Sequence, residues 1–169
     1  MTREEAEEIL TKAGEGPDDG FPLFEAALAC AVHDDPSRDT KAAIDLANDA
    51  VERLRRRAET ESPEEAVAET LAGDLRLTGD VITYDHPDNA DVIAIAHRRK
   101  GLPVALGVFY LHAARAAGLE LYGVDFPGHF LLRIETEEGP LALDPLSEGR
   151  VVLPSELSRR ALRTGLMPD

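Results

Sequence analysis

The stretch that decides the fold spans residues 97–144 and reads HRRKGLPVALGVFYLHAARAAGLELYGVDFPGHFLLRIETEEGPLALD. Within it, Pro103 suits the first position of a helix, because the N–H that proline lacks would have no partner there. From Val104 to Ala117 apolar residues fall on nearly every face, which indicates a helix buried on all sides. Gly118 is the usual residue just past a helix end. We therefore predict a buried central helix that ends before Gly118.

Short strands are expected after this helix. Leu119 to Phe126 is rich in aromatic and branched residues and is closed by the turn residues Pro127 and Gly128. Residues 129–135 alternate between apolar and polar side chains, and Leu141 to Asp144 does the same after a turn at 136–139. Together these segments predict a small antiparallel sheet.

The apolar pattern also predicts how the last two strands pair. A slip of one residue would move every apolar side chain to the wrong face of the sheet. Pairing Leu132 with Leu141 puts the large apolar groups of both strands on one side. That register sets His129 directly opposite Asp144, with Cβ atoms roughly 4.5–5.5 Å apart. The sequence therefore predicts an imidazole–carboxylate pair.

Such a pair has two interpretations. The carboxylate can simply fix the orientation of the histidine ring, or the two can be the base and the orienting group of a catalytic triad. The second interpretation needs a nucleophile, yet no cysteine, serine or threonine lies between Ala90 and Glu135. The one thiol, Cys30, lies in the segment AALACAV, where a small buried hydrophobe fits better than a reactive group.

The motifs in this region resemble those of the transglutaminase-like superfamily, and within it the SirB-type N-terminal domain. They are Gly101-Leu102-Pro103 opening an alanine-rich helix, Gly118, a strand, Pro127-Gly128-His129-Phe130 and Leu143-Asp144-Pro145. The resemblance covers about Tyr84 to Arg150. It implies an α+β fold on a papain-like scaffold, in which a helical N-terminal part packs on a small antiparallel sheet with a buried central helix.

The resemblance also implies which residues carry chemistry. In catalytic members the helix begins with a nucleophilic cysteine two residues after a glycine, and a histidine and an aspartate follow on successive strands. His129 and Asp144 match that pattern, but Pro103 stands in place of the cysteine. We therefore expect a non-catalytic module whose cleft binds a peptide, a protein partner or a small ligand. The alternative is a hydrolase or acyl transferase that uses His129 and Asp144 with water or an unconventional nucleophile.

The loop TYDHPDNAD, residues 83–91, contains several oxygen and nitrogen side chains that can act as metal ligands, and a metal site is one hypothesis for it. Its spacing matches no calcium loop, and zinc would need a remote ligand. Capping of a helix over 92–99 by Asn89 or Asp91 is the simpler explanation, so we expect neither a metal nor a cofactor. The resemblance implies that the loop lines the cleft, which makes Tyr84, Asp85 and Asn89 candidate binding residues. Tyr110, on the central helix, is a further candidate, with packing as its other explanation.

Composition restricts the partners. The 33 acidic residues outnumber the 18 lysines and arginines and give a net charge of −15. Phosphate backbones and anionic membranes would be repelled, so neither nucleic acid nor membrane is an expected partner. The acidic start MTREEAEEIL is no signal peptide, no apolar run is long enough to span a bilayer, and one cysteine excludes an intrachain disulfide. We therefore expect a cytoplasmic protein.

The length of 169 residues predicts one compact domain. We divide it into a helical part (1–72), a transglutaminase-like core (73–150) and a C-terminal helix with a tail (151–169). In the helical part, helices are expected over 4–12, from 21 to about 33, over 40–58 and over 62–72. Ser62 is expected to cap the last of these. Two apolar sets are expected to face the core: Ile44, Ala47, Val51 and Leu54 in the third helix, and Leu75, Leu77, Val81 and Ile82 after the fourth.

Overall fold

The computed structural model describes residues 1–165 and has an α+β architecture, as predicted. Its helices are α1 (Arg3–Glu15), α2 (Leu23–Asp34), α3 (Lys41–Arg57), α4 (Pro63–Ala68), α5 (Val92–Arg98), α6 (Pro103–Ala117) and α7 (Pro154–Arg163). Shorter helical turns are η1 (Glu69–Asp74), η2 (Pro87–Ala90) and η3 (Pro145–Ser147). The strands are β1 (Thr78–Gly79), β2 (Lys100–Gly101), β3 (Leu121–Phe126), β4 (His129–Ile134), β5 (Leu141–Asp144) and β6 (Arg150–Val152).

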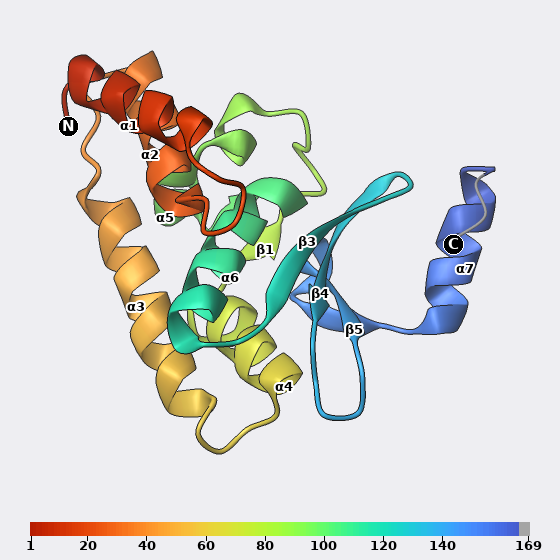
Figure 1. The fold of residues 1–169 in the computed structure, drawn as a ribbon. Helices are drawn as coiled ribbons and strands as arrows, with labels where there is room; N and C mark the ends of the chain where they lie inside the picture. Colours follow the sequence, from red (N-terminus) through yellow and green to blue (C-terminus); the bar gives the residue numbers. More distant parts are fainter. Residues whose placement is uncertain (166–169) are drawn as a thin grey trace.

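Helix α6 lies at the centre of the molecule. The N-terminal helices pack on one side of it and the four-stranded sheet on the other (Figure 1). Leu106, Phe109 and Tyr110 are fully buried along this helix. Its start at Pro103 and its left-handed cap at Gly118, with a φ of 78°, both confirm the sequence prediction. The hydrophobic core therefore extends from the N-terminal helices through α6 to the sheet.

The larger sheet is antiparallel, with strand order β3-β4-β5-β6. Strands β3 and β4 pair from Leu121 with Ile134 to Phe126 with His129, so the turn between them contains only Pro127 and Gly128. Gly128 has a φ of 73°, which a glycine adopts without strain. This tight turn brings the first residue of β4 to the end of the sheet.

The predicted register of β4 and β5 is wrong by two residues. Leu132 pairs with Leu143 rather than with Leu141. Continuing this register sets Asp144 level with Leu131, so Asp144 is a diagonal rather than a direct neighbour of His129. A slip of two residues keeps every side chain on its own face, so the apolar pattern cannot detect it. The longer loop between Ile134 and Leu141 decides the pairing.

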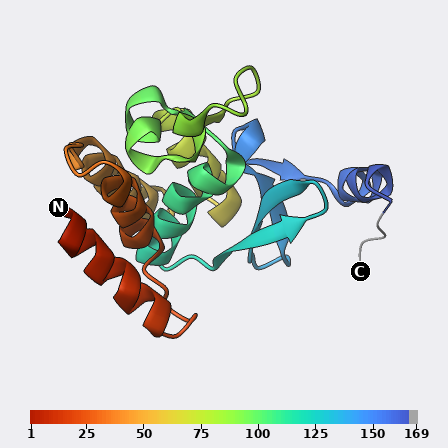
Figure 2. The ribbon, with the colours of Figure 1, turned by 90° about the horizontal axis from the view of Figure 1, so that it is seen from above.

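The two faces of the sheet have different partners. Phe130 faces α6 so closely that a Cβ atom at Gly107 would come within 2.7 Å of its ring. On the other face, Leu131 and Val152 are 2% exposed and Ala161 of α7 is fully buried. Helix α7 therefore covers the face that points away from α6, beyond the sheet in Figure 2.

Several side chains depart from the predicted core. Ile44 is 39% exposed, because α3 turns Ala43, Leu46, Ala47, Ala50 and Leu54 inward instead. Leu75 and Leu77 are buried as expected, but Val81 and Ile82 are 70% and 88% exposed. Ser62 makes no side-chain cap at α4. Across residues 1–165, each helix is too short or too polar to cross a membrane.

Candidate functional site

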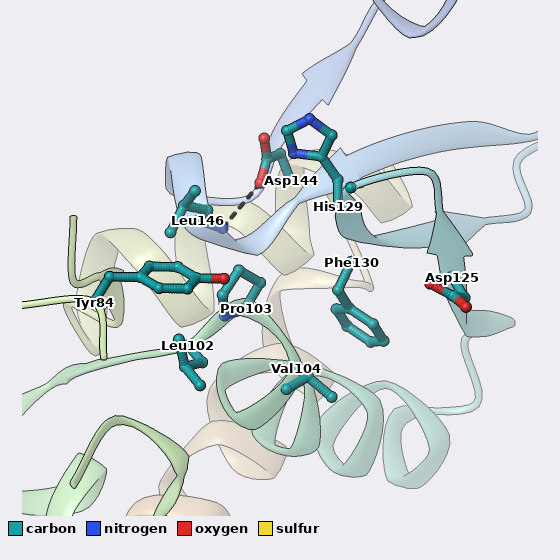
Figure 3. Close-up of a pocket in the computed structure, with 10 residues that line it drawn as sticks. Tyr84, Leu102, Pro103, Val104, Asp125, His129, Phe130, Asp144 and Leu146 are labelled. Carbon is teal, nitrogen blue, oxygen red and sulfur yellow. Dashed lines mark hydrogen bonds between the residues drawn. The ribbon is translucent and has the colours of Figure 1, made fainter. Parts of the chain in front are cut away.

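A pocket of about 480 Å³ lies where the N-terminus of α6 meets the end of the sheet. Three parts of the chain border it: the segment before η2, the turn between β3 and β4, and the start of η3. The side chains in Figure 3 show Tyr84 on one side of the pocket and Asp125 on the other, with Pro103 between them. The lining residues are Tyr84, Leu102, Pro103, Val104, Asp125, Gly128, His129, Phe130, Asp144 and Leu146.

Pro103 lies at the first position of α6, at the base of the pocket. The residue before it is held in place, since the Leu102 N–H donates to the carbonyl of Asn89 at 2.8 Å. Of the residues that the structure describes, none of those lining the pocket is a cysteine, a serine or a threonine. The pocket walls therefore offer no sulfur or hydroxyl nucleophile of the usual aliphatic kind.

His129 and Asp144 both face this pocket, and their side chains lie next to each other in Figure 3. The imidazole is on an exposed residue, whereas Asp144 is 3% exposed. Within residues 1–165, no hydrogen bond or ion pair joins the two side chains. The side chains of the predicted pair are therefore neighbours that make no direct hydrogen bond.

The partner of Asp144 is Arg160, which the sequence reasoning missed. Its Nη2 donates to Oδ2 of Asp144 at 2.9 Å, and the side chains are only 13% and 5% exposed. The other carboxylate oxygen accepts from the Leu146 N–H at 3.0 Å, and the Ser147 hydroxyl lies 3.4 Å from Oδ2. The carboxylate is thus held by its own loop and by α7.

Glu156 forms ion pairs with both Arg160 and Arg150. It accepts from Arg150 at 2.7 Å and from Arg160 at 2.8 Å. Hydrogen bonds from Arg150 and then Arg160 lower the pKa of the Glu156 carboxyl to about 2. The i, i+4 spacing of Glu156 and Arg160 was visible in the sequence, but it gave no sign that the arginine reaches Asp144.

Asn89 holds the loop that carries Tyr84. It is fully buried, donates to the carbonyls of Thr83 at 2.6 Å and Tyr84 at 3.1 Å, and accepts from Arg98 at 3.0 Å. Its side chain is therefore outside the pocket and positions the loop. Asp85 is exposed and is also absent from the pocket lining. Of the three loop residues predicted to bind, only Tyr84 lines the pocket.

Asp91 caps α5 as the sequence suggested. Its Oδ1 accepts from the backbone N–H groups of Ile93 at 2.9 Å and Ala94 at 2.8 Å. The hydrogen bond from Arg38 and those from the two N–H groups lower the pKa of the Asp91 carboxyl, against the opposing effect of its burial. This carboxylate is therefore already engaged at a helix start.

The comparison with protein families agrees with this geometry. The family described as the transglutaminase-like superfamily matches residues 40–168. The chain belongs to this superfamily. Its match includes the whole pocket, from Tyr84 to Leu146.

Relatives of this transglutaminase-like chain are known from several bacteria. It is 35% identical over 148 residues to a UPF0162 protein of Xylella fastidiosa, covering 85% of this chain and 53% of that protein. It is 28% identical over 135 residues to a UPF0162 protein of Pseudomonas aeruginosa, covering 78% and 49%. It is 35% identical over 69 residues to F-box only protein 21 of Mus musculus, covering 41% and 11%. The chain thus spans about half the length of the bacterial relatives that it matches over most of its own length. No solved structure matches it.

Tyr110 lies away from the pocket of this transglutaminase-like domain. It is fully buried, and among the described residues its hydroxyl has no hydrogen-bond partner. A Cβ atom at Gly149 would come within 3.0 Å of that hydroxyl, so the ring is tightly enclosed. Burial raises the pKa of the Tyr110 phenol. The structure therefore places Tyr110 in the core, which was its other explanation, and not at the predicted binding site.

Cys30 is exposed, which corrects the prediction of a buried side chain. It borders a different hollow, between α2 and the segment from Pro87 to Asp91, and is not part of the pocket lining. Across residues 1–165, no group of three histidine, cysteine or acidic side chains is arranged to hold a metal ion.

Proposed function

We propose that this transglutaminase-like domain, of the SirB type, is a binding module that takes a segment of a protein or peptide into its pocket and forms no covalent bond with it. The observation that carries the proposal is the proline at the start of α6. Pro103 lines the pocket beside His129, where a catalytic member would present a thiol. A ring without a nucleophilic atom cannot form an acyl intermediate.

The arrangement of Asp144 supports the same proposal. In a triad the carboxylate accepts a hydrogen bond from the histidine ring and stabilises its charged form. Here Oδ2 of Asp144 accepts from Arg160 and Oδ1 accepts from the backbone of Leu146. A carboxylate neutralised by an arginine is a weak orienting group for a general base.

One observation favours the alternative, hydrolysis by water. The imidazole of His129 faces the pocket, and no hydrogen bond to its ring occurs within residues 1–165. Such a ring is free to accept a proton from water, which general-base catalysis requires.

Turnover of small substrates separates the two functions. The purified chain is incubated with p-nitrophenyl acetate and with a fluorogenic amide, beside a His129→Ala variant and a His97→Ala control that removes another exposed histidine, on α5. The binding proposal predicts that all three proteins release product at the same slow rate. Faster release by the parent that is lost in His129→Ala, kept in His97→Ala and accompanied by an unchanged melting temperature would establish the hydrolase instead.

A further inference from the structure

The segment between β1 and η2 presents apolar side chains to solvent next to the pocket. Val81, Ile82 and Tyr84 are 70%, 88% and 47% exposed. The segment stands out from the body of the molecule in Figure 2, and Tyr84 reaches from it to the pocket wall in Figure 3. We call Val81, Ile82 and Tyr84 the apolar lip. Burial of such aliphatic side chains is favourable, and the fold does not gain it here.

The lip is held in one conformation. Asp80, only 4% exposed, accepts from the backbone N–H groups of Ile82 at 3.2 Å and Thr83 at 2.9 Å, and from the Thr83 hydroxyl at 2.5 Å. Arg98 donates to the same carboxylate at 3.1 Å. Asn89 fixes the other end through the carbonyls of Thr83 and Tyr84. Since the backbone of the lip is already ordered, the lip would lose little conformational entropy when a partner binds there.

The opposite side of the pocket is negative. Asp125 is exposed, and its carboxylate has no hydrogen bond or ion pair in residues 1–165. No lysine or arginine is among the described residues that line the pocket. The ring of Phe130 lies between Tyr84 of the lip and this carboxylate in Figure 3, and aromatic faces attract cations. The chain as a whole carries a net charge of −15, which favours a positively charged partner.

From these observations we infer that the pocket recognises a peptide segment with an arginine or lysine near an apolar residue, the cation lying toward Asp125 and the apolar side chain on the lip. This inference rests on the proposed binding function and names the chemistry of its partner. It combines a rigid apolar surface, of which Tyr84 lines the pocket, with an unpaired charge on the opposite side of that pocket.

The test uses acetylated and amidated hexapeptides in which one leucine and one arginine are separated by one, two or three alanines. Matched peptides replace the arginine by its uncharged isostere citrulline, or the leucine by alanine. Binding is followed by the NMR shifts of the backbone amides of Tyr84, Gly128 and His129. We expect the best arginine peptide to bind about fivefold more tightly than its citrulline counterpart, the range of a partly exposed ion pair.

Two variants assign the contacts. Asp125→Asn should remove the preference for arginine over citrulline. Ile82→Ser should weaken every leucine peptide about fivefold but keep that preference, since it removes only apolar contact. Their controls are Asp19→Asn, an equal charge change at an exposed residue before α2, and Ile44→Ser, an equal apolar loss at a partly exposed residue on α3.

The outcomes separate the inference from the function on which it rests. If arginine and citrulline peptides bind equally at the pocket amides, the inferred recognition of a cation is overturned, but the proposed binding function still stands. An effect of Asp19→Asn as large as that of Asp125→Asn reduces the preference to general charge attraction and overturns the assigned contact. Peptides that shift none of the pocket amides, or only amides elsewhere, overturn the proposed binding function itself.

Discussion

Pro103 serves the fold and offers no nucleophilic atom at the start of α6. Its fixed φ and missing N–H suit the first turn of α6, where no carbonyl is available to accept a hydrogen bond. The same helix start would lower the pKa of a thiol, which is why nucleophilic cysteines are common there. The N-terminus of α6 would therefore favour the thiolate form of a cysteine at residue 103, where the proline offers no nucleophile.

A thiol introduced at residue 103 tests this effect of the helix N-terminus. In a Cys30→Ser background, which removes the exposed native thiol, Pro103→Cys should react with iodoacetamide at pH 7 about tenfold faster than Cys30 does in the parent chain. The reason is a larger thiolate fraction beside the helix N-terminus and His129. Alkylation is measured by mass spectrometry against time. Adding His129→Ala should slow the reaction, and an introduced thiol that reacts no faster than Cys30 would contradict the placement of the helix start in the pocket.

Tyr110 gives a second prediction at this scale. Its buried hydroxyl has no partner among the described residues, and an unpaired buried polar group is destabilising by about 1–3 kcal/mol. Tyr110→Phe should therefore leave the free energy of unfolding unchanged or raise it by up to about 1 kcal/mol in urea denaturation. Tyr122→Phe, at a residue that is 51% exposed, is the neutral control. A loss above about 1 kcal/mol in Tyr110→Phe alone would mean that the hydroxyl has a partner after all.

At the scale of elements, two ion pairs hold α7: Glu156 with Arg150 of β6, and the more deeply buried pair of Arg160 with Asp144. Arg160 joins it to Asp144 beneath the pocket and to Glu156 within the helix. Ala161 is its only fully buried residue, so the apolar contact that holds the helix is small. The ion pair is largely buried, and loss of one partner would leave an uncompensated charge. The position of α7 is therefore linked to the state of Asp144.

Arg160→Met should release α7. The variant keeps the apolar stem but leaves Asp144 without its arginine, a change worth about 3 kcal/mol for a buried pair. Amide hydrogen exchange from Pro154 to Arg163 should become at least about tenfold faster, while exchange in α6 changes little. Arg159→Met, at the exposed neighbouring residue, serves as the matched control. Unchanged exchange in α7 would show that its apolar contacts and the pair of Glu156 with Arg150 suffice.

At the scale of the whole molecule, the excess of acidic groups opposes compaction. The net charge is −15, and most ion pairs lie on the surface, where each contributes at most about 1 kcal/mol. Salt screens both the repulsion and these attractions, but the acidic residues outnumber the lysines and arginines by 33 to 18, so more repulsion than attraction is screened. The repulsive effect should therefore dominate the response to ionic strength.

Raising sodium chloride from about 10 mM to about 200 mM should increase the melting temperature by about 2–4 °C, a change near 1 kcal/mol for a chain of this size. Differential scanning calorimetry measures it, and potassium chloride at the same concentrations should give the same increase if the effect is screening. A decrease would mean that the surface ion pairs, and not the excess of acids, control stability.

Much of this fold was predictable from local sequence patterns. The buried central helix, its proline start and glycine stop, and the strand ranges after it follow from periodicity and turn chemistry within a few residues. Pro103 and His129 could be placed at one site only through the resemblance to the transglutaminase-like superfamily, because local signals give the helix start and the strand but not their proximity. The exposure of Val81 and Ile82 was missed, since an apolar run shows its composition but not what covers it.

Sequence alone thus determined the main helices, the strands from β3 to β5, the apolar face of β4 and β5 and the residue at the helix start, because these depend on neighbours along the chain. Only the tertiary structure decided the register of β4 and β5, the arginine that binds Asp144 and the position of the apolar lip. Because side chains alternate between the two faces of a strand, registers that differ by two residues bury the same side chains, and the connection between the strands decides between them. An arginine sixteen residues from its carboxylate must be brought there by the packing of a whole helix, and no local pattern specifies which partner it will meet.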